Sequence, residues 1–145
     1  MTPLTPPRGR PDGAPPLVVL VVEDQPELRE VLCHVLSDGD VLAVGVPDGA
    51  AALEFLEREP APAALILDLV LPRVDGWQVL DRLRVEPQLA PMPIVIISAA
   101  PRERVAQALA HGPALFLPKP LDAVRLVRSI RRVCGLDPDA APRAA

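Results

Sequence analysis

Five polar residues follow short apolar runs, and their side chains suit the transfer of a phosphoryl group to a carboxylate. They are Glu23 and Asp24 after residues 17–22, Asp68 after 63–67, Ser98 after 93–97 and Lys119 after 114–117. In such a transfer the aspartate is the nucleophile, a divalent metal neutralises phosphoryl oxygens, and a lysine and a hydroxyl bind the remaining oxygens. Asp68 is therefore the candidate nucleophile, and Ser98 and Lys119 are the candidates for binding the phosphoryl oxygens.

Three carboxylates at one place repel each other and raise each other's pKa unless a cation compensates them. A hard divalent cation with oxygen ligands does this, and Mg²⁺ suits one or two carboxylates plus waters and a phosphate. The sequence has no His or Cys cluster with metal-binding spacing. Residues 22–26, Val-Glu-Asp-Gln-Pro, form no glycine-rich phosphate loop, and their two acidic side chains would repel a nucleotide pyrophosphate. This pattern favours a Mg²⁺ site and argues against a nucleotide-binding protein.

The elements that position these side chains follow from hydrophobic periodicity. We expect strands at 17–22, 40–46, 63–67, 93–97 and 114–117, and helices at 26–36, 48–57, 76–84, 102–110 and 122–133. Strands that are apolar almost throughout indicate a parallel sheet covered on both faces, hence an α/β fold of five βα units. Two doubly wound strand orders, 3-2-1-4-5 and 2-1-3-4-5, fit this alternation. In both, ligands bind at the carboxyl ends of the strands, so the polar residues would meet there.

Length and composition predict one domain, at residues 17–135, between two disordered ends. Residues 1–16 contain six prolines, and residues 136–145 are rich in Ala and Pro. The net charge of −4 argues against a nucleic-acid binder. The longest strongly apolar run, 17–22, is too short to cross a membrane, and the amino-terminal segment lacks the apolar stretch of a signal peptide. We expect a cytoplasmic protein with reduced thiols at Cys33 and Cys134.

Five motifs in order resemble the receiver domain of two-component response regulators, over about residues 17 to 134. They are L-V-V-L-V-V-E-D-Q (17–25), P-D-G-A-A-A-L (47–53), L-I-L-D-L-V-L-P-R-V-D-G (65–76), I-V-I-I-S-A (94–99) and F-L-P-K-P (116–120). The resemblance implies a flavodoxin-like (βα)5 fold of the CheY-like type, with sheet order 2-1-3-4-5. It also implies that Lys119–Pro120 is a cis peptide.

The resemblance further assigns roles to the candidate site residues. Asp68 would be phosphorylated by a histidine kinase or a histidine phosphotransfer protein, with Mg²⁺ as cofactor. The metal ligands would be Asp24, Asp68, the backbone carbonyl of Val70, and Glu23 through water. Ser98 and Phe116 would be the switch residues, and Lys119 would pair with phosphoryl oxygens. The chain would be no enzyme beyond Mg²⁺-dependent self-phosphorylation and self-dephosphorylation.

The expected output is protein–protein contact, because only about ten loose residues follow the last predicted helix and leave no room for an output domain. The resemblance places a downstream protein target on the face formed by the fourth helix, fifth strand and fifth helix, and allows a phosphorylation-dependent homodimer. Direct contact with nucleic acid or membrane is not expected. The alternative function is an interaction module of the same fold that no longer needs phosphate. A hydrolase is disfavoured because Leu69 and Val70, after Asp68, supply no second catalytic acid.

Some positions depart from the family pattern. Residues 113–115, Pro-Ala-Leu, make the approach to Phe116 stiffer and more apolar than usual. Val70 and Ala100 give little polar help to a water that attacks the phosphoryl group, which predicts a long-lived phosphoprotein. The last predicted helix carries a basic side, which either complements the helix dipole or docks an acidic partner surface. Its members are Arg125, Arg128, Arg131 and Arg132.

Overall fold

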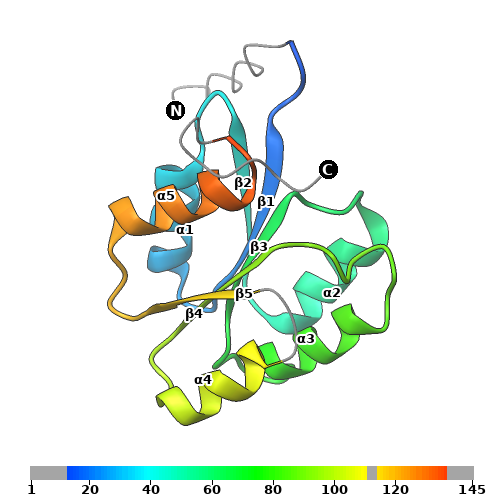
Figure 1. Ribbon diagram of the computed structural model, residues 1–145, viewed down its shortest axis with the longest axis vertical. Helices are drawn as coiled ribbons and strands as arrows, with labels where there is room; N and C mark the ends of the chain where they lie inside the picture. The colour runs from blue at the N-terminus through cyan, green and yellow to red at the C-terminus, as the bar shows by residue number, and fades with distance from the viewer. Residues whose placement is uncertain (1–12, 111–113, 137–145) are drawn as a thin grey trace.

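The apolar segments of the chain form a five-stranded parallel sheet, with helices on both faces (Figure 1). The computed structural model describes residues 13–110 and 114–136. The strands are β1 (Leu17–Val22), β2 (Val41–Val46), β3 (Ala64–Asp68), β4 (Ile94–Ser98) and β5 (Ala114–Pro118). The helices are α1 (Pro26–Leu36), α2 (Gly49–Arg58), α3 (Gly76–Arg84), α4 (Arg102–Leu109) and α5 (Ala123–Val133). The strand order β2-β1-β3-β4-β5 confirms the predicted 2-1-3-4-5 order and excludes 3-2-1-4-5.

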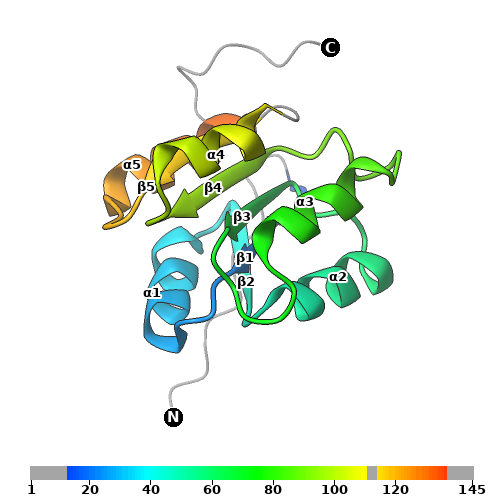
Figure 2. The same ribbon diagram turned by 90° about the horizontal axis from the view of Figure 1, so that it is seen from below.

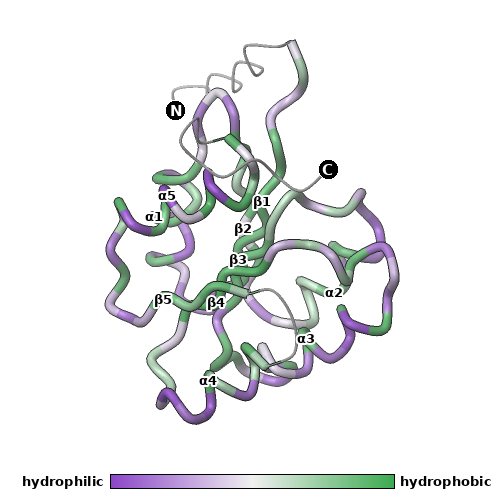
Figure 3. The backbone as a smooth tube through the Cα atoms, in the orientation of Figure 1, coloured by the Kyte–Doolittle hydropathy of each residue, from purple (hydrophilic) through white to green (hydrophobic). Residues whose placement is uncertain are grey.

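Alternate residues of the central strands build a hydrophobic core on each face of the sheet. Leu20 and Val22 of β1 belong to a first cluster with side chains of α2, α3 and α4. Val19 and Val21 belong to a second cluster with side chains of α1 and α5. Figure 2 shows these two helix layers on opposite sides of the sheet, and Figure 3 shows the hydrophobic strands between more hydrophilic helices. Burial on both faces explains why the strands are apolar almost throughout.

Three helices begin at aspartates that accept hydrogen bonds from backbone N–H groups of the first helical turn. Asp48 accepts from the Ala51 N–H at 2.7 Å before α2, and Asp122 accepts from the Arg125 N–H at 3.2 Å before α5. Asp75 forms a reciprocal capping box with Gln78 at the start of α3. The predicted helices 48–57 and 122–133 include Asp48 and Asp122 as their first residues. The structure makes them N-caps, so these helices start one residue later.

The strands β3, β4 and β5 each extend one residue beyond the predicted end. Asp68 is in register with Ile97, and Ser98 is in register with Pro118. The Lys119 N–H then donates to the Ser98 carbonyl oxygen at 3.0 Å. The prediction ends the strands before Asp68 and Ser98 because their side chains are polar, yet their backbones continue the strand ladder.

Two interactions tie helices to distant segments. The partly buried Trp77 of α3 donates its indole N–H to the Arg104 carbonyl oxygen at 3.3 Å, and the Arg104 guanidinium lies 4.5 Å from the centre of the Trp77 ring. On the other face, Arg131 of α5 forms ion pairs of 3.2 Å with both Asp38 and Asp40, between α1 and β2. The first contact joins α3 to α4, and the second joins α5 to the turn before β2.

Several predictions concern segments outside the described residues. The Pro-rich arm is described only from residue 13, the tail only at Leu136, and Pro113 not at all. Among the described residues, no helix is both long and apolar enough to cross a membrane.

Candidate functional site

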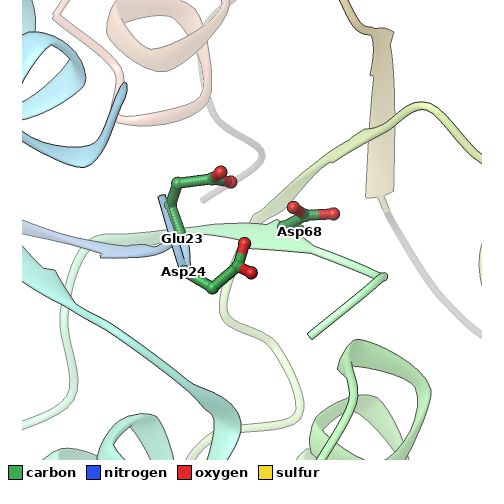
Figure 4. A group of neighbouring side chains, drawn as sticks. All are labelled: Glu23, Asp24 and Asp68. Carbon is green, nitrogen blue, oxygen red and sulfur yellow. The ribbon is translucent and has the colours of Figure 1, made fainter. Parts of the chain in front are cut away.

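Three carboxylates meet at the carboxyl ends of β1 and β3. Glu23 and Asp24 come directly after β1, and Asp68 is the last residue of β3. One oxygen from each of the three lies within 4.8 Å of the others. Figure 4 shows the Glu23 and Asp24 side chains turned toward the side on which the Asp68 carboxylate lies. Glu23 is 0% exposed and Asp68 is 3% exposed, whereas Asp24 is open to solvent.

The Lys119 ammonium links two of these carboxylates. Its Nζ atom donates to Asp68 Oδ2 at 2.8 Å and to Glu23 Oε1 and Oε2 at 3.1 and 3.2 Å. Lys119 comes directly after β5 and is followed by the cis Lys119–Pro120 peptide bond, which confirms the isomer implied by the resemblance. The sheet therefore brings one cation and two buried anions into direct contact from three strand ends.

The charge balance of this site is uneven. The pKa of Glu23 is raised from 4.5 to about 7, first by burial and then by a hydrogen bond and charge repulsion from Asp68, against the lowering effect of Lys119. Burial acts to lower the pKa of Lys119, but its hydrogen bonds and attraction to Asp68 and Glu23 outweigh burial and leave that pKa raised. One lysine thus leaves the acidic group short of positive charge, a need that a divalent cation would meet.

The loop after β3 positions Asp68. The Val70 N–H donates to Asp68 Oδ1 at 3.0 Å, and the Gly76 N–H donates to the Leu69 carbonyl oxygen at 2.9 Å. A Cβ atom at Gly76 would lie 2.5 Å from the Asp68 carbonyl oxygen and 2.6 Å from the Leu69 Cα atom. Only glycine allows the start of α3 to lie this close to the loop, which holds the Asp68 backbone against the helix.

The two predicted switch residues, Ser98 and Phe116, lie in different surroundings. Ser98, at the end of β4, is buried, and its Oγ accepts a hydrogen bond from the Ala100 N–H at 2.9 Å. Within the described part of the chain, no hydrogen bond joins Ser98 to Asp68. Phe116, in β5, is partly buried and packs against the first core cluster. In this state, neither side chain is bonded to the carboxylate group.

The donor set fits Mg²⁺. Carboxylate oxygens are the ligands that this hard cation prefers, and oxygens on opposite sides of Mg²⁺ lie about 4.2 Å apart. One oxygen from each of Glu23, Asp24 and Asp68 lies within 4.8 Å of the others, so a single cation could be held by them directly or through water. Val70, whose N–H group donates to the Asp68 carboxylate, is 56% exposed and lies beside this group of carboxylates.

Comparison with known families identifies this arrangement. The model of the response regulator receiver domain matches residues 19–131, which is most of the chain. The chain belongs to the response regulator receiver family. It is therefore a receiver domain of a two-component system, and its acidic cluster is typical of the site that is phosphorylated on aspartate in this family. Receiver domains are usually phosphoacceptors and not enzymes, and histidine kinases phosphorylate them.

Relatives and solved structures agree with this family. An uncharacterized 14.6 kDa protein of Leptolyngbya boryana is 35% identical over 124 residues, which cover 84% of this chain and 94% of that protein. Response regulator Rre1 of Synechocystis is 32% identical over 123 residues, covering 83% of this chain. The chain spans about half of Rre1, or 52% of its length. The receiver domain of a Pseudomonas aeruginosa sensor histidine kinase, with magnesium in its active site cleft, matches with a TM-score of 0.71 and 26% identity over 83% of this chain and 98% of that one.

The direct bond between Glu23 and Lys119 was not predicted from the sequence. The two residues are far apart in the chain, and the resemblance paired Lys119 with phosphoryl oxygens alone. No local pattern signals this bond, because β1 is buried on both faces and its alternation does not distinguish the buried Glu23 from the exposed Asp24.

Proposed function

We propose that this protein is a response regulator that accepts a phosphoryl group on Asp68 and signals by protein–protein contact. One observation supports this above all. A buried aspartate at the end of the central strand β3 lies 2.8 Å from a lysine ammonium and within 4.8 Å of two further carboxylates. An ion pair alone would need only one carboxylate, whereas three carboxylates and one lysine suit a site that receives a cation and a phosphoryl group.

In the proposed reaction an oxygen of the Asp68 carboxylate attacks phosphorus. The new P–O bond forms as the bond from phosphorus to the donor's histidine nitrogen breaks, and the electron pair stays on that nitrogen. Lys119, already in contact with Asp68, would remain beside the acyl phosphate and neutralise one phosphoryl oxygen. The buried Ser98 hydroxyl would exchange its bond with the Ala100 N–H for a bond to another phosphoryl oxygen.

Glu23, Asp24, Asp68 and the Val70 carbonyl oxygen would hold Mg²⁺. The metal supplies positive charge to the phosphoryl oxygens during transfer. Asp24 is the exposed member and is suited to direct ligation, whereas Glu23, bonded to Lys119, would act mainly through water. Self-phosphorylation from small donors and self-dephosphorylation would be the only reactions of the chain itself.

The output would pass through Ser98 and Phe116 to the face built by α4, β5 and α5. Phosphorylation would shift an equilibrium between two arrangements of this face, and a downstream protein or a second copy would recognise one of them. Residues 17–135 would form the signalling domain between the Pro-rich arm and the Ala/Pro-rich tail. The phosphodonor would be a histidine kinase or a histidine phosphotransfer protein in the cytoplasm, where Cys33 and Cys134, which form no disulfide in the described residues, would stay reduced.

Incubation with acetyl phosphate and Mg²⁺, followed by intact mass spectrometry, tests the proposal. We expect a gain of one phosphoryl group in the natural chain and none in Asp68→Asn. Asp81→Asn is a matched control, because Asp81 is an exposed aspartate of α3 paired with Arg84. It should be modified like the natural chain. No gain with acetyl phosphate or a phosphorylated histidine donor would refute the phosphoacceptor function and favour the phosphate-independent interaction module.

A further inference from the structure

A groove on the surface between β5 and α5 has a composition that the phosphoacceptor site does not explain. It has a volume of about 780 Å³, and its lining combines apolar residues of β5 with arginines of α5. On the β5 side Leu115, Phe116 and Leu117 contribute, and Leu115 is 42% exposed. Because β5 is the last strand of the sheet, no further strand from the described residues covers its outer edge.

Three arginines form one rim of this groove. Arg125, Arg128 and Arg132, called the groove arginines below, are spaced three and four residues apart and so share one side of α5 over about 10 Å. All three are exposed. Within residues 13–110 and 114–136, no ion pair joins any of them to a carboxylate, and α5 itself contains no acidic residue.

Arg131 differs from the groove arginines, although it also lines the groove. Its guanidinium is bound by Asp38 and Asp40 at 3.2 Å, and it donates to the Leu136 carbonyl oxygen at 3.4 Å. Its charge is thus already used to hold α5 against the turn before β2. Dipole complementation, which requires cations only in the last turn of a helix, accounts for Arg131 and Arg132. It leaves Arg125 and Arg128, nearer the amino end of α5, unexplained.

We propose that this groove binds an acidic polypeptide segment of a partner protein, with carboxylates on the groove arginines and an apolar side chain against Leu115. Charge complementarity identifies the partner as acidic. The chain as a whole has a net charge of −4, so the groove arginines form a local basic rim that attracts acidic side chains. The apolar β5 wall favours a polypeptide over a nucleic acid, whose phosphates would leave that wall uncovered. An exposed apolar patch with a charged rim is typical of protein interaction sites.

Phe116 connects this groove with the proposed function. It lines the groove and also packs against the first core cluster, so an inward turn of its ring would change the groove wall. The coupling to phosphorylation therefore rests on the proposed phosphoacceptor function, whereas the groove itself does not. We expect phosphorylation to change the affinity of the chain for the acidic segment, because it would alter this wall of the groove.

Fluorescence anisotropy with the full chain tests the inference. The probe is a labelled helical peptide of about 12 residues, or about 18 Å, with glutamates on one side and leucines on the other. It should bind, and binding should weaken as salt is raised. The triple charge reversal Arg125→Glu, Arg128→Glu and Arg132→Glu should weaken binding at least about tenfold, or about 1.4 kcal/mol. Leu115→Ser should weaken it by a smaller factor.

Matched controls separate this groove from general charge attraction. The triple Arg58→Glu, Arg82→Glu and Arg84→Glu makes the same charge change on α2 and α3, outside the α4, β5 and α5 face, and should leave affinity within about twofold. The triple Arg→Gln variant of the groove arginines checks the result without charge reversal and should also weaken binding.

Three results would overturn the inference. They are equal losses in both reversal triples, equal binding of a peptide with glutamine in place of glutamate, or tighter binding of single-stranded oligothymidine through the groove arginines. The phosphoacceptor function is judged separately, because peptide binding to the Asp68→Asn chain measures the groove without phosphorylation.

Discussion

Replacement of Glu23 by glutamine should change how the folding stability of the metal-free protein depends on pH. Glu23 is fully buried, and its pKa is raised to about 7 by burial and then by Asp68, against Lys119. Glutamine keeps the shape of the protonated side chain but cannot ionise. The variant therefore removes one titration from the folded state and leaves the surrounding packing in place.

The direction and the size of the effect follow from proton binding. In the unfolded chain the Glu23 carboxyl titrates near its ordinary value of 4.5, so between pH 4.5 and about 7 the folded state holds more protons. Stability must then fall as pH rises through this window. A tenfold change in proton affinity is worth about 1.4 kcal/mol, so the fall approaches about 3 kcal/mol by about pH 8. Lys119, whose pKa is raised, loses its stabilising effect only at alkaline pH, outside this window.

Urea denaturation in EDTA, at several values from pH 4.5 to about pH 8, measures the effect. The free energy of unfolding of Glu23→Gln minus that of the natural chain should grow by about 3 kcal/mol across this range. Saturating Mg²⁺ should remove much of the growth, because a nearby cation favours the ionised carboxylate. Glu54→Gln, on the exposed side of α2, is the control and should follow the natural chain. A difference that stays constant within about 0.5 kcal/mol, or shrinks with pH, would refute the reasoning.

Three further predictions concern the same end of the sheet. Val70→Gln should shorten the lifetime of phosphorylated Asp68 by providing polar help for an attacking water, measured as loss of the phosphoryl mass over time; a lifetime of only seconds in the natural chain would contradict this account of Val70. Lys119→Met leaves two buried carboxylates without their ammonium and should cost about 3 kcal/mol in EDTA, with partial recovery in Mg²⁺; equal urea midpoints would argue against the geometry described. Gly76→Ala forces a Cβ against backbone atoms and should cost about 1 to 3 kcal/mol, whereas Gly45→Ala meets mainly the Arg29 side chain, which can move, and should cost less.

The fold was predictable from sequence because its signals are local. The apolar runs and the helical periodicity placed all ten elements, and several errors at the ends came from polar residues. Asp48 and Asp122 were counted as helical although they cap their helices, and Asp68 and Ser98 were counted outside strands that they end. The strand order, which periodicity left open between two choices, followed from the resemblance.

The sequence predicted which residues form the candidate site, but not the hydrogen bonds among them. Strand ends in a parallel sheet meet at one edge, so the residues after each apolar run identified the group. Which carboxylate Lys119 contacts depends on how far β5 and β1 extend and on the direction of each side chain, which no local pattern contains. The basic residues of α5 show the same limit, because the bond from Arg131 to Asp38 and Asp40 joins segments about ninety residues apart.

The contact between Trp77 and Arg104 gives the protein a built-in optical probe. Trp77 is the only tryptophan and the chain has no tyrosine, so its near-ultraviolet emission comes from one site. The indole bonds to the backbone of α4 and lies beneath a guanidinium of the same helix. A displacement of α4 would alter both the polarity and the quenching around the ring. The unlabelled chain can thus report in real time whether a chemical event at Asp68 reaches the helix that follows Ser98.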